Sequence, residues 1–581
     1  MRKVQWLPRN DSQRMGLPAE GRFPFLIQKI LQSRGIEPTA DLENFFNPKL
    51  TQLKDPFSLL NMEKAVARLK EAFLKKQRIC IYGDFDLDGT SGLALLKSGL
   101  EQMGFQNLQY YQPKRLTEGY GLHAKVVEDL ASQGVQLILT VDLGITAMEA
   151  CAVAKAKGID VVITDHHQPA DELPEAVAIV NPNQKGDTSG CGYLCGAGVG
   201  FYLLRALARE LTESQLIQPD QVKLKSLLDC FTIATVTDMV PLVEDNRTLV
   251  KQGLIELQKT ERRGLKALMK ALGFSGRSLS SQDLAIRIAP KINALSRMEL
   301  GVRPIDLYLV EDELEAEQMV ETVLDNNHTR VQLQGSGEQE AFEMLKAWPE
   351  SDFVFLASKS FHRGVVGLIA TKLANETHKP TFIGSLSEDG IVTGSARLPN
   401  GSEASLIEIF QSTKNSFDRF GGHEAAAGFE LHERKISEVI ENFRNYLASE
   451  KSTPRPRTHY YDTEARLEEL TESFMKWVDH LGPFGQGFEV PTIKLEAAKV
   501  SQRLVLKEQH LKLKLEVGQT GKMIDALFFS CPSEHWARNL KKGEWVEVLG
   551  EVQWNYFTGT RSLQVLIKDL RPVANTSMSA L

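Results

Sequence analysis

The sequence predicts an α/β protein with a parallel-sheet first domain, a long connecting helix, a smaller second α/β domain and a C-terminal β-barrel. Three observations support this prediction. Strand-like and helix-like runs alternate between residues 79 and 180, a second alternation starts at Asp352, and short strand-like runs fill residues 490–581. Apolar strands that alternate with helices are typical of a parallel sheet with both faces covered.

Length and composition restrict the class of protein. At roughly 150 residues per domain, 581 residues suggest about three or four domains. The net charge of −7 means that any site for a polyanion must be a local patch. The N-terminus has no apolar signal-peptide core and no stretch approaches 18 uninterrupted apolar residues, so we expect a cytoplasmic protein without a membrane segment.

The six cysteines form no paired framework, which favours a reducing compartment. Cys191 and Cys195 have C-x₃-C spacing, but no second Cys or His pair lies close by in the sequence. We interpret them as packing residues of a Gly-rich segment, with a zinc site as the alternative.

Residues 1–55 are interpreted as an N-terminal extension, and residues 56–245 as the first domain. A helical pattern at 62–76 leads into the first strand. Ligands of open α/β sheets bind at the carboxyl ends of the strands. The expected strands are ICIYG (79–83), LQYY (108–111), QLILTV (136–141), DVVIT (160–164) and AVAIV (176–180).

The first strand ends in an acidic stretch, with Asp84, Asp86 and Asp88 at every second position before Gly89. In an extended backbone these three side chains would share one face. Three crowded carboxylates repel one another unless a cation neutralises them, and such oxygen-rich sites suit Mg²⁺ or Mn²⁺. The alternative is a solvated acidic turn, because Asp and Gly are ordinary turn residues.

Two further strands end in polar residues. Asp142 follows the strand LILTV directly, and Asp165, His166 and His167 follow VVIT. Carboxyl ends of parallel strands meet at one edge, so these residues favour a metal site over an exposed histidine pair. Asp238 ends a later apolar run that we expect to be helical, and it becomes a candidate closing ligand, although alone it would be a capping or turn residue.

The second half divides into four segments. Residues 246–348 form a helical connector, with one charge-rich helix over 311–348, and 349–450 form the second α/β domain. Residues 451–573 begin with a Pro/basic linker and continue as a β-barrel, and 574–581 are a tail. Residues 490–581 contain 13 Lys/Arg against 9 Asp/Glu. Trp554, Tyr556 and Phe557 lie near Arg561 and are either base-stacking surfaces or barrel core.

A series of motifs resembles a known family. The motifs are GDFDLDGT (83–90), TVDLGIT (140–146), TDHH (164–167), TVTDMVPL (235–242), IAPKINALSRM (288–298), FHRGVVGLIATKL (361–373), GSARL (394–398), FGGHEAAAGF (420–429) and LGPFGQGFEVP (481–491). In order and number they resemble the RecJ family of the DHH phosphoesterase superfamily, over roughly residues 40–573. The resemblance implies an OB-like fold for the barrel, a known platform for single strands.

The resemblance also implies a two-metal site with Mn²⁺ or Mg²⁺. One cation would be held by Asp86 and Asp142 with Asp84 nearby, and Asp142 would bridge to the second. The ligands of that second cation would be Asp88, Asp142, His166 and Asp238. His167 would face the scissile phosphate. We expect Asp165 to orient a histidine or the loop rather than bind metal.

Phosphate contacts are implied for Arg115, Asn293 and Arg297, and a substrate grip for Ser395, Arg397 and His423. Phe85, Leu87, Ser296, Phe361 and Leu398 depart from the family's usual residues, and no expected ligand is missing.

The function implied by the resemblance is metal-dependent 5′→3′ hydrolysis of single-stranded DNA to mononucleotides, in DNA repair and recombination. Single-strand-binding protein and a helicase are the implied partners, and we expect a monomer. Two alternatives stay open at this point. One is a phosphodiesterase of short oligonucleotides or cyclic dinucleotides, and the other is a non-catalytic single-strand-binding scaffold.

Overall fold

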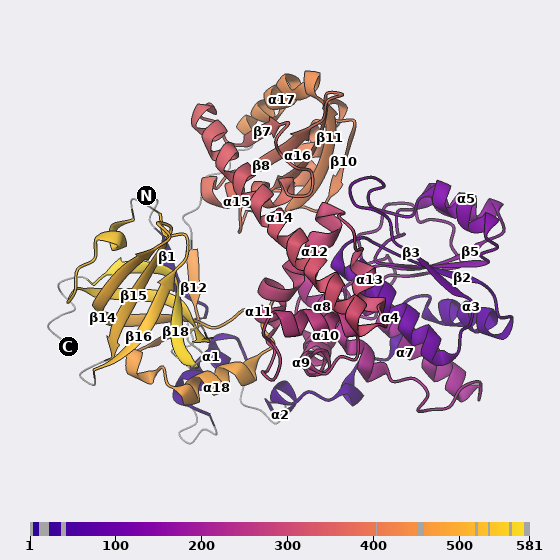
Figure 1. The fold of residues 1–581 in the computed structure, drawn as a ribbon, viewed down its shortest axis with the longest axis horizontal. Helices are drawn as coiled ribbons and strands as arrows, with labels where there is room; N and C mark the ends of the chain where they lie inside the picture. Colours follow the sequence, from indigo (N-terminus) through magenta and orange to yellow (C-terminus); the bar gives the residue numbers. More distant parts are fainter. Residues whose placement is uncertain are drawn as a thin grey trace. The chain divides into compact units, whose positions relative to one another are not determined.

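The structure, a computed structural model, describes residues 4–10, 23–36, 42–402, 404–449, 458–517, 521–532, 535–556 and 561–573 (Figure 1). The chain divides into two compact units. The large unit comprises Lys54–Val240 and Gln252–Thr453, and the small unit comprises Met1–Leu53, Pro241–Lys251 and Pro454–Leu581. Among the described residues, no helix has the length and apolar character needed to cross a membrane.

The first sheet of the large unit is parallel, in the order β3-β2-β4-β5-β6. Strands β2 and β4 are buried at every position, as expected for central strands covered on both faces. The register pairs Gly83 with Val141 and Val141 with Thr164, so β2, β4 and β5 end at one level. The strands are β2 (Ile79–Gly83), β3 (Leu108–Tyr111), β4 (Leu137–Val141), β5 (Asp160–Thr164) and β6 (Ala178–Val180).

Helices cover both faces of this sheet (Figure 1). A core cluster joins α5 and α6 to one face, with Val127, Leu130 and Cys151 packed against Tyr82 and Ile138. Helix α4 contacts α7 and α8 on the other side, and α7 contacts α3. The helices are α3 (Met62–Leu74), α4 (Leu87–Met103), α5 (Ala124–Ser132), α6 (Met148–Ala156), α7 (Gly196–Glu213) and α8 (Leu228–Thr237).

A helical segment follows and ends in the long helix α14. At the N-cap of α14, the side chain of Asp312 accepts a hydrogen bond from Glu315 N. Helices α10 and α12 pack against α14. A π-helical turn at Leu284–Ile288 precedes α12. The helices are α9 (Glu244–Gln258), α10 (Arg263–Ala271), α11 (Ser281–Asp283), α12 (Ala289–Met298), α13 (Pro304–Leu309) and α14 (Glu313–Ala347).

The second sheet has the order β10-β11-β9-β8-β7, parallel between β7 and β8 and antiparallel elsewhere. One face buries a phenylalanine-rich core that includes Phe382, Phe410 and Phe443, and the other packs on α15 and α14. The elements are β7 (Val354–Ser358), α15 (Val366–Thr377), β8 (Thr381–Leu386), β9 (Ile391–Arg397), α16 (Leu406–Ser412), β10 (Arg419–Gly422), β11 (Ala426–His432) and α17 (Ile436–Ser449).

The small unit contains a five-stranded barrel with the order β14-β15-β16-β18-β17, closed by pairing of β17 with β14. This is the strand order of an OB-fold, and closure leaves no free sheet edge among these strands. Its core also includes α1 and α18. The elements are α1 (Phe25–Ser33), α2 (Leu42–Phe46), α18 (Glu472–Leu481), β13 (Thr463–Ala465), β14 (Thr492–Leu506), β15 (His510–Val517), β16 (Lys522–Phe528), β17 (Trp545–Asn555) and β18 (Ser562–Pro572).

The N-terminal segment is part of this unit. Strand β1 (Gln5–Pro8) pairs in parallel with β12 (Thr458–Tyr461), and Trp6 donates a hydrogen bond to Asp569. Arg34 forms an ion pair of 2.7 Å with the fully buried Asp462. What the sequence presents as an extension therefore packs on the barrel.

Two local expectations are wrong. The backbone after β2 is not extended through Asp88, because α4 already begins at Leu87 and Asp88 lies in its first turn. The second is the expectation of short strands throughout residues 490–581, because β14 is 15 residues long. Its alternation is broken by a register shift between Val500 and Gln502, which hides the period of two.

Candidate metal centre and phosphate site

The acidic stretch after β2 changes from loop to helix at Asp86. As the N-cap of α4, Asp86 accepts hydrogen bonds from the backbone N–H groups of Asp88 (2.9 Å) and Gly89 (3.1 Å). Asp84 lies two residues earlier, directly after β2, and is buried. A Cβ on Gly89 would lie 2.5 Å from the backbone nitrogen of Asp84, so this close approach requires glycine.

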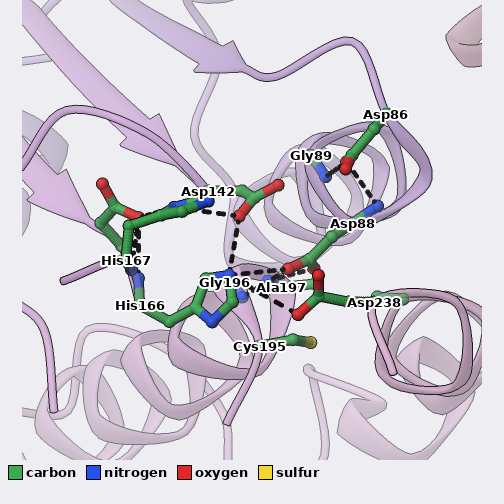
Figure 2. A network of polar contacts seen from close by, with 12 residues as sticks. Asp86, Asp88, Gly89, Asp142, His166, His167, Cys195, Gly196, Ala197 and Asp238 are labelled. Atoms are coloured by element: carbon green, nitrogen blue, oxygen red, sulfur yellow. Dashed lines mark hydrogen bonds and ion pairs between the residues drawn. The ribbon is translucent and has the colours of Figure 1, made fainter. Parts of the chain in front are cut away.

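Asp88 is held by the N-terminus of α7. Its two carboxylate oxygens accept hydrogen bonds from the backbone N–H groups of Gly196 (2.6 Å) and Ala197 (2.8 Å), as Figure 2 shows. The unpaired N–H groups and the positive end of the helix dipole favour a carboxylate here. These hydrogen bonds offset the cost of burying the Asp88 carboxylate, of which only 1% is exposed.

Asp142 directly follows β4, and its backbone is left-handed with φ of 65°. Such a conformation is uncommon for a residue other than glycine and stores strain at this position. Asp142 N donates to Thr164 O at 3.0 Å, and the side chain is buried. The turn directs the carboxylate back over the edge of the sheet, toward Asp88 and His166 (Figure 2).

The loop after β5 is anchored by Asp165, whose side chain is fully buried. Its Oδ1 accepts hydrogen bonds from the backbone of His166 (2.7 Å) and from Nδ1 of His167 (2.8 Å), and Oδ2 accepts from Ile145 N (2.9 Å). Asp165 is thus occupied within the loop. The His166 side chain points the other way, with Nε2 3.3 Å from Asp142 Oδ1.

Asp238 completes the cluster from the C-terminal end of α8. His166 Nε2 lies 3.6 Å from Asp238 Oδ2 and 3.8 Å from Asp88 Oδ2. Potential ligand atoms approach within 4.8 Å of one another in three groups, of which one contains both Asp142 and His166 and each of the other two contains one of them. The groups are Asp84/Asp86/Asp142, Asp88/His166/Asp238 and Asp142/His166/His167.

The electrostatics of the cluster are unfavourable without a cation. Burial first, and neighbouring carboxylates second, raise the pKa of Asp84 to about 8, of Asp88 to about 6 and of Asp238 to about 9. Burial and the same neighbours also raise the pKa of Asp142 well above its usual value. Four acids that resist ionisation around one point form a site that positive charge would stabilise.

The pKa values of His166 and His167 are shifted in opposite directions. Burial, followed by the charge of His167, lowers the pKa of His166 to about 4, so His166 is a neutral imidazole suited to ligation. For His167, burial opposes the charged form, but the hydrogen bond from Nδ1 to Asp165 outweighs it and the pKa rises to about 9. His167 is therefore a cation near neutral pH in the cation-free protein.

The residues fit a pair of hard divalent cations. Three carboxylate oxygens, Asp84 Oδ1, Asp142 Oδ1 and Asp238 Oδ2, are buried and accept no hydrogen bond within the described part of the chain. Such buried acceptors are costly unless a ligand satisfies them. Carboxylate oxygens with one neutral imidazole are the ligand types that suit Mg²⁺ and Mn²⁺.

Arginines gather beside this centre. The Arg115 guanidinium lies over the ring of Phe85 at 4.2 Å, and its buried Nε has no hydrogen-bond partner among the described residues. Arg297, in the last turn of α12, donates to Gly364 O at 3.1 Å. Burial and then the charges of Arg115, Arg397 and Arg330 lower the pKa of Arg297 to about 9. Asn293 lies one turn before Arg297 in α12.

The second sheet supplies the remaining expected substrate residues. Arg397 donates to Ser395 Oγ at 2.6 Å, and both are on β9. A Cβ on Gly367, in the first turn of α15, would lie 3.0 Å from Arg397 Nη2. The His423 ring stacks on His167 at 5.6 Å, so the GGH motif reaches the metal centre.

Sequence departures from the family pattern fall mainly on packing positions. Phe361 and Leu398 are buried in the cores of the second α/β domain. Ser296 is buried in α12 and donates to Asn293 O at 3.2 Å. Cys191 and Cys195 are buried, and Cys195 Sγ contacts Thr235 Oγ1.

The sequence patterns missed residues that support the centre. Asn181 and Asn183 donate to the carbonyls of His167 (2.9 Å) and His166 (2.5 Å). They follow β6 directly, so the rule of polar residues at strand ends would have found them. Tyr120 OH lies 3.2 Å from His167 Nδ1. Arg330, on α14, donates to Asn327 and Gln334, and no local pattern singled it out.

The barrel aromatics differ from one another. Trp554 packs against the barrel core, donates to Asp479 at 2.7 Å and is covered by the Arg561 guanidinium at 3.9 Å. Tyr556 is 47% exposed. Phe557 lies outside the described residues.

Family models match three segments of the chain. The DHH family N-terminal domain matches residues 78–235, the DHHA1 domain matches 351–449, and the RecJ OB domain matches 461–569. These segments contain the parallel sheet, the second sheet and the barrel.

Curated relatives align over nearly the whole of this chain. The single-stranded-DNA-specific exonuclease RecJ of Escherichia coli is 31% identical over 98% of this chain and 100% of its own length. That of Haemophilus influenzae is 31% identical over 94% and 96%. Among solved structures, RecJ of Thermus thermophilus with Mn²⁺ aligns with a TM-score of 0.78 and 26% identity, over 98% of this chain and 79% of that chain. The same enzyme has been solved with Mg²⁺.

Proposed function

This chain belongs to the RecJ family of single-stranded-DNA-specific exonucleases, and we infer that it hydrolyses single-stranded DNA from the 5′ end in a metal-dependent reaction. The observation that carries this inference is the set of overlapping carboxylate and histidine groups around Asp142 and His166. Mn²⁺ or Mg²⁺ is the cofactor, in keeping with the relative solved with each ion.

We assign Asp84, Asp86 and Asp142 to one cation and Asp88, Asp142, His166 and Asp238 to the other, with Asp142 shared. When bound, such a pair supplies a water of lowered pKa and stabilises charge on the phosphate oxygens. The chain contributes the fixed geometry: Asp88 is held by the N-terminus of α7, and Asp142 by the strained turn after β4.

His167 is the residue that we assign to the scissile phosphate. Its Nδ1 is bound by Asp165, which leaves Nε2 free to donate a proton or hydrogen bond. A positively charged imidazole stabilises the negative charge that grows on a phosphate oxygen as the P–O bond breaks. Asp165 acts through His167, as a positioning residue.

The arginines form the proposed grip for the 5′-terminal phosphate. Burial first, and then the charges of Arg115 and Arg397, lower the pKa of Arg297, so an anion between these three groups would be favourable. Guanidinium groups bind phosphate oxygens with paired hydrogen bonds. Asn293, Ser395 and His423 would add neutral donors. A strand whose terminal phosphate is fixed here presents its first phosphodiester to the acidic centre.

We propose a division of labour among the segments with the boundaries given above. Residues 56–245 cut, 349–450 hold the strand end together with Arg115 and Arg297, and 451–573 bind the rest of the single strand. We propose that the protein acts in the cytoplasm, in DNA repair and recombination, and as a monomer. The proposed partners are single-strand-binding protein and a helicase. The six cysteines are all buried, which suits a reducing compartment.

The decisive experiment follows a single-stranded oligonucleotide with Mn²⁺, labelled at the 5′ end in one reaction and at the 3′ end in another. We expect the 5′ label to appear at once as mononucleotide and the 3′ label to shorten progressively. Asp142→Ala should abolish both. Asp171→Ala, which removes an exposed carboxylate from the same domain, is the matched control and should behave as wild type.

Other results would point elsewhere. Faster turnover of dinucleotides than of long strands would favour a small-substrate phosphodiesterase. Binding without cleavage under every divalent metal would mean that the protein is a scaffold, and the proposed ligands would then be wrong.

A further inference from the structure

Two proposed phosphate ligands come from segments far apart in the chain, and one carboxylate joins them. Arg115 lies in the loop after β3, whereas Arg297 lies at the end of α12. Glu299 Oε1 accepts a hydrogen bond of 2.7 Å from Leu116 N, the residue after Arg115. Glu299 is itself only two residues after Arg297. The contact therefore spans 183 positions of sequence and ties the two arginine-bearing segments together.

The backbone at Glu299 is shaped for this contact. Glu299 is the C-cap of α12, with φ of 51°, and its N–H donates to Leu295 O at 2.9 Å. Glycine or asparagine is the usual choice for this left-handed cap. A glutamate accepts strain here, which is explained if its side chain has a task that glycine cannot perform.

The Arg115 loop has little other support toward α12. Gln112, at its start, donates to Asp84 O (2.8 Å) and Thr90 Oγ1 (2.6 Å). Glu118 accepts from Lys114 N at 2.7 Å and closes the loop on itself. Neither contact sets the distance between Arg115 and Arg297.

The negative charge of Glu299 also stabilises the positive charge of Arg115. Burial lowers the pKa of Arg115, and the carboxylates of Asp86, Asp84 and Glu299 act against that shift. Asp86 and Asp84 are proposed metal ligands, so their charge is shared with a cation once the centre is filled. Glu299 then remains a nearby anion that offsets repulsion between the arginines.

We propose that Glu299 is a positioning residue that holds the Arg115 loop against the end of α12, so that Arg115 and Arg297 bind the same 5′-terminal phosphate. This inference rests on the proposed exonuclease function and adds to it the residue that builds the phosphate site. The ligand is a phosphomonoester at the 5′ end of a single strand.

The test compares kcat/KM on two oligonucleotides that differ only in a 5′-phosphate or a 5′-hydroxyl. Glu299→Gly removes the side chain and suits the backbone, and Glu299→Gln keeps an oxygen that can accept from Leu116 N. We expect Glu299→Gly to reduce the preference for 5′-phosphate by about tenfold, mainly through KM. Glu299→Gln should stay within about threefold of wild type, because the hydrogen bond survives.

Two controls separate positioning from folding. Glu321→Ala removes an exposed carboxylate of α14 and should leave the preference unchanged. Mn²⁺ affinity by calorimetry should be unchanged in all Glu299 variants, because the acidic centre is not altered. An unchanged preference in folded Glu299→Gly would overturn the inference. If Glu299→Gly fails to fold, Glu299→Ala replaces it, and an unchanged preference in that folded variant would overturn the inference instead. Wild-type protein that does not cut single strands would refute the proposed function itself.

Discussion

Gly196 leaves the space that Asp142 occupies. A Cβ at position 196 would lie 2.4 Å from Cβ of Asp142, closer than such atoms approach in proteins. Gly196 N also donates to Asp88. Gly196, at the start of α7, therefore sets the distance between the carboxylate of Asp88 in α4 and that of Asp142 after β4.

We therefore expect Gly196→Ala to displace Asp142 or α7 and to lower both activity and stability. Overpacking of this kind costs about 1–3 kcal/mol. Thermal unfolding and exonuclease rate would be measured together. Gly335→Ala is the control, because Gly335 has open space around it in α14 and alanine is a better helix former there. Wild-type activity in folded Gly196→Ala would contradict the proposed crowding.

Cation binding should release protons. In the cation-free protein Asp84 has a pKa of about 8 and Asp238 of about 9, so both hold protons near neutral pH. These protons must leave before the oxygens ligate, so Mn²⁺ affinity should increase as pH rises from 6 to 9. Calorimetry in two buffers of different ionisation enthalpy measures the protons released. Equal heats in both buffers would contradict the prediction.

The same pKa shifts set the stability of the cation-free protein. Because the folded pKa values lie above the unfolded value near 4, the native state binds more protons than the unfolded chain between these limits. The stabilisation from these bound protons is fully present below pH 4. It is lost progressively as pH rises from about 4 to the folded pKa values of about 8 and 9. The melting temperature without metal should therefore fall over this range, and saturating Mn²⁺ should remove the fall.

Asp165→Asn tests the positioning of His167. Asparagine keeps one acceptor oxygen for the backbone N–H of His166, loses the acceptor for Ile145 N, and removes the negative charge 2.8 Å from His167 Nδ1. The pKa of His167 should fall below its value of about 9, and activity should drop by about 10–100-fold. A histidine NMR titration of cation-free protein reads the pKa directly. An unchanged His167 titration would exclude this role for Asp165.

Strand ends could be predicted from the sequence because a buried parallel strand is a continuous apolar run. Strands β3 and β5 begin and end where their patterns predict. The convergence of Asp142 and Asp165 at one sheet edge follows from the same rule. What local pattern could not supply is contact between distant segments. The bond from Glu299 to Leu116 and the stacking of His423 on His167 depend on tertiary packing.

The acidic stretch illustrates a second limit. Alternating Asp84, Asp86 and Asp88 has the period of a strand, but Asp86 is also a good N-cap. Capping prevailed, and helix α4 begins at Leu87. The three carboxylates therefore divide into two groups. Asp84 and Asp86 lie with Asp142, whereas Asp88, held by the N-terminus of α7, lies with His166 and Asp238.

The two barrel aromatics should respond differently to truncation. Trp554→Ala removes core packing and the hydrogen bond to Asp479, so it should lower the melting temperature. Tyr556→Ala alters a half-exposed ring, so it should leave the melting temperature unchanged. If Tyr556 stacks on a base, single-strand affinity falls by about 1–3 kcal/mol. If both variants lowered single-strand affinity equally and neither changed the melting temperature, the assignment of Trp554 to the barrel core would be wrong.

Arg397 offers the sharpest test of polarity. It donates to Ser395 Oγ and lies beside the first turn of α15, so Arg397→Lys keeps the charge but loses the paired hydrogen bonds. We expect the preference for 5′-phosphate over 5′-hydroxyl ends to fall by about tenfold or more in Arg397→Lys and further in Arg397→Ala. Mn²⁺ affinity should not change. Arg419→Ala, an exposed arginine of the same sheet, is the control. If Arg397→Ala keeps the full preference, the 5′-phosphate is bound elsewhere and the proposed direction of the strand loses its structural basis.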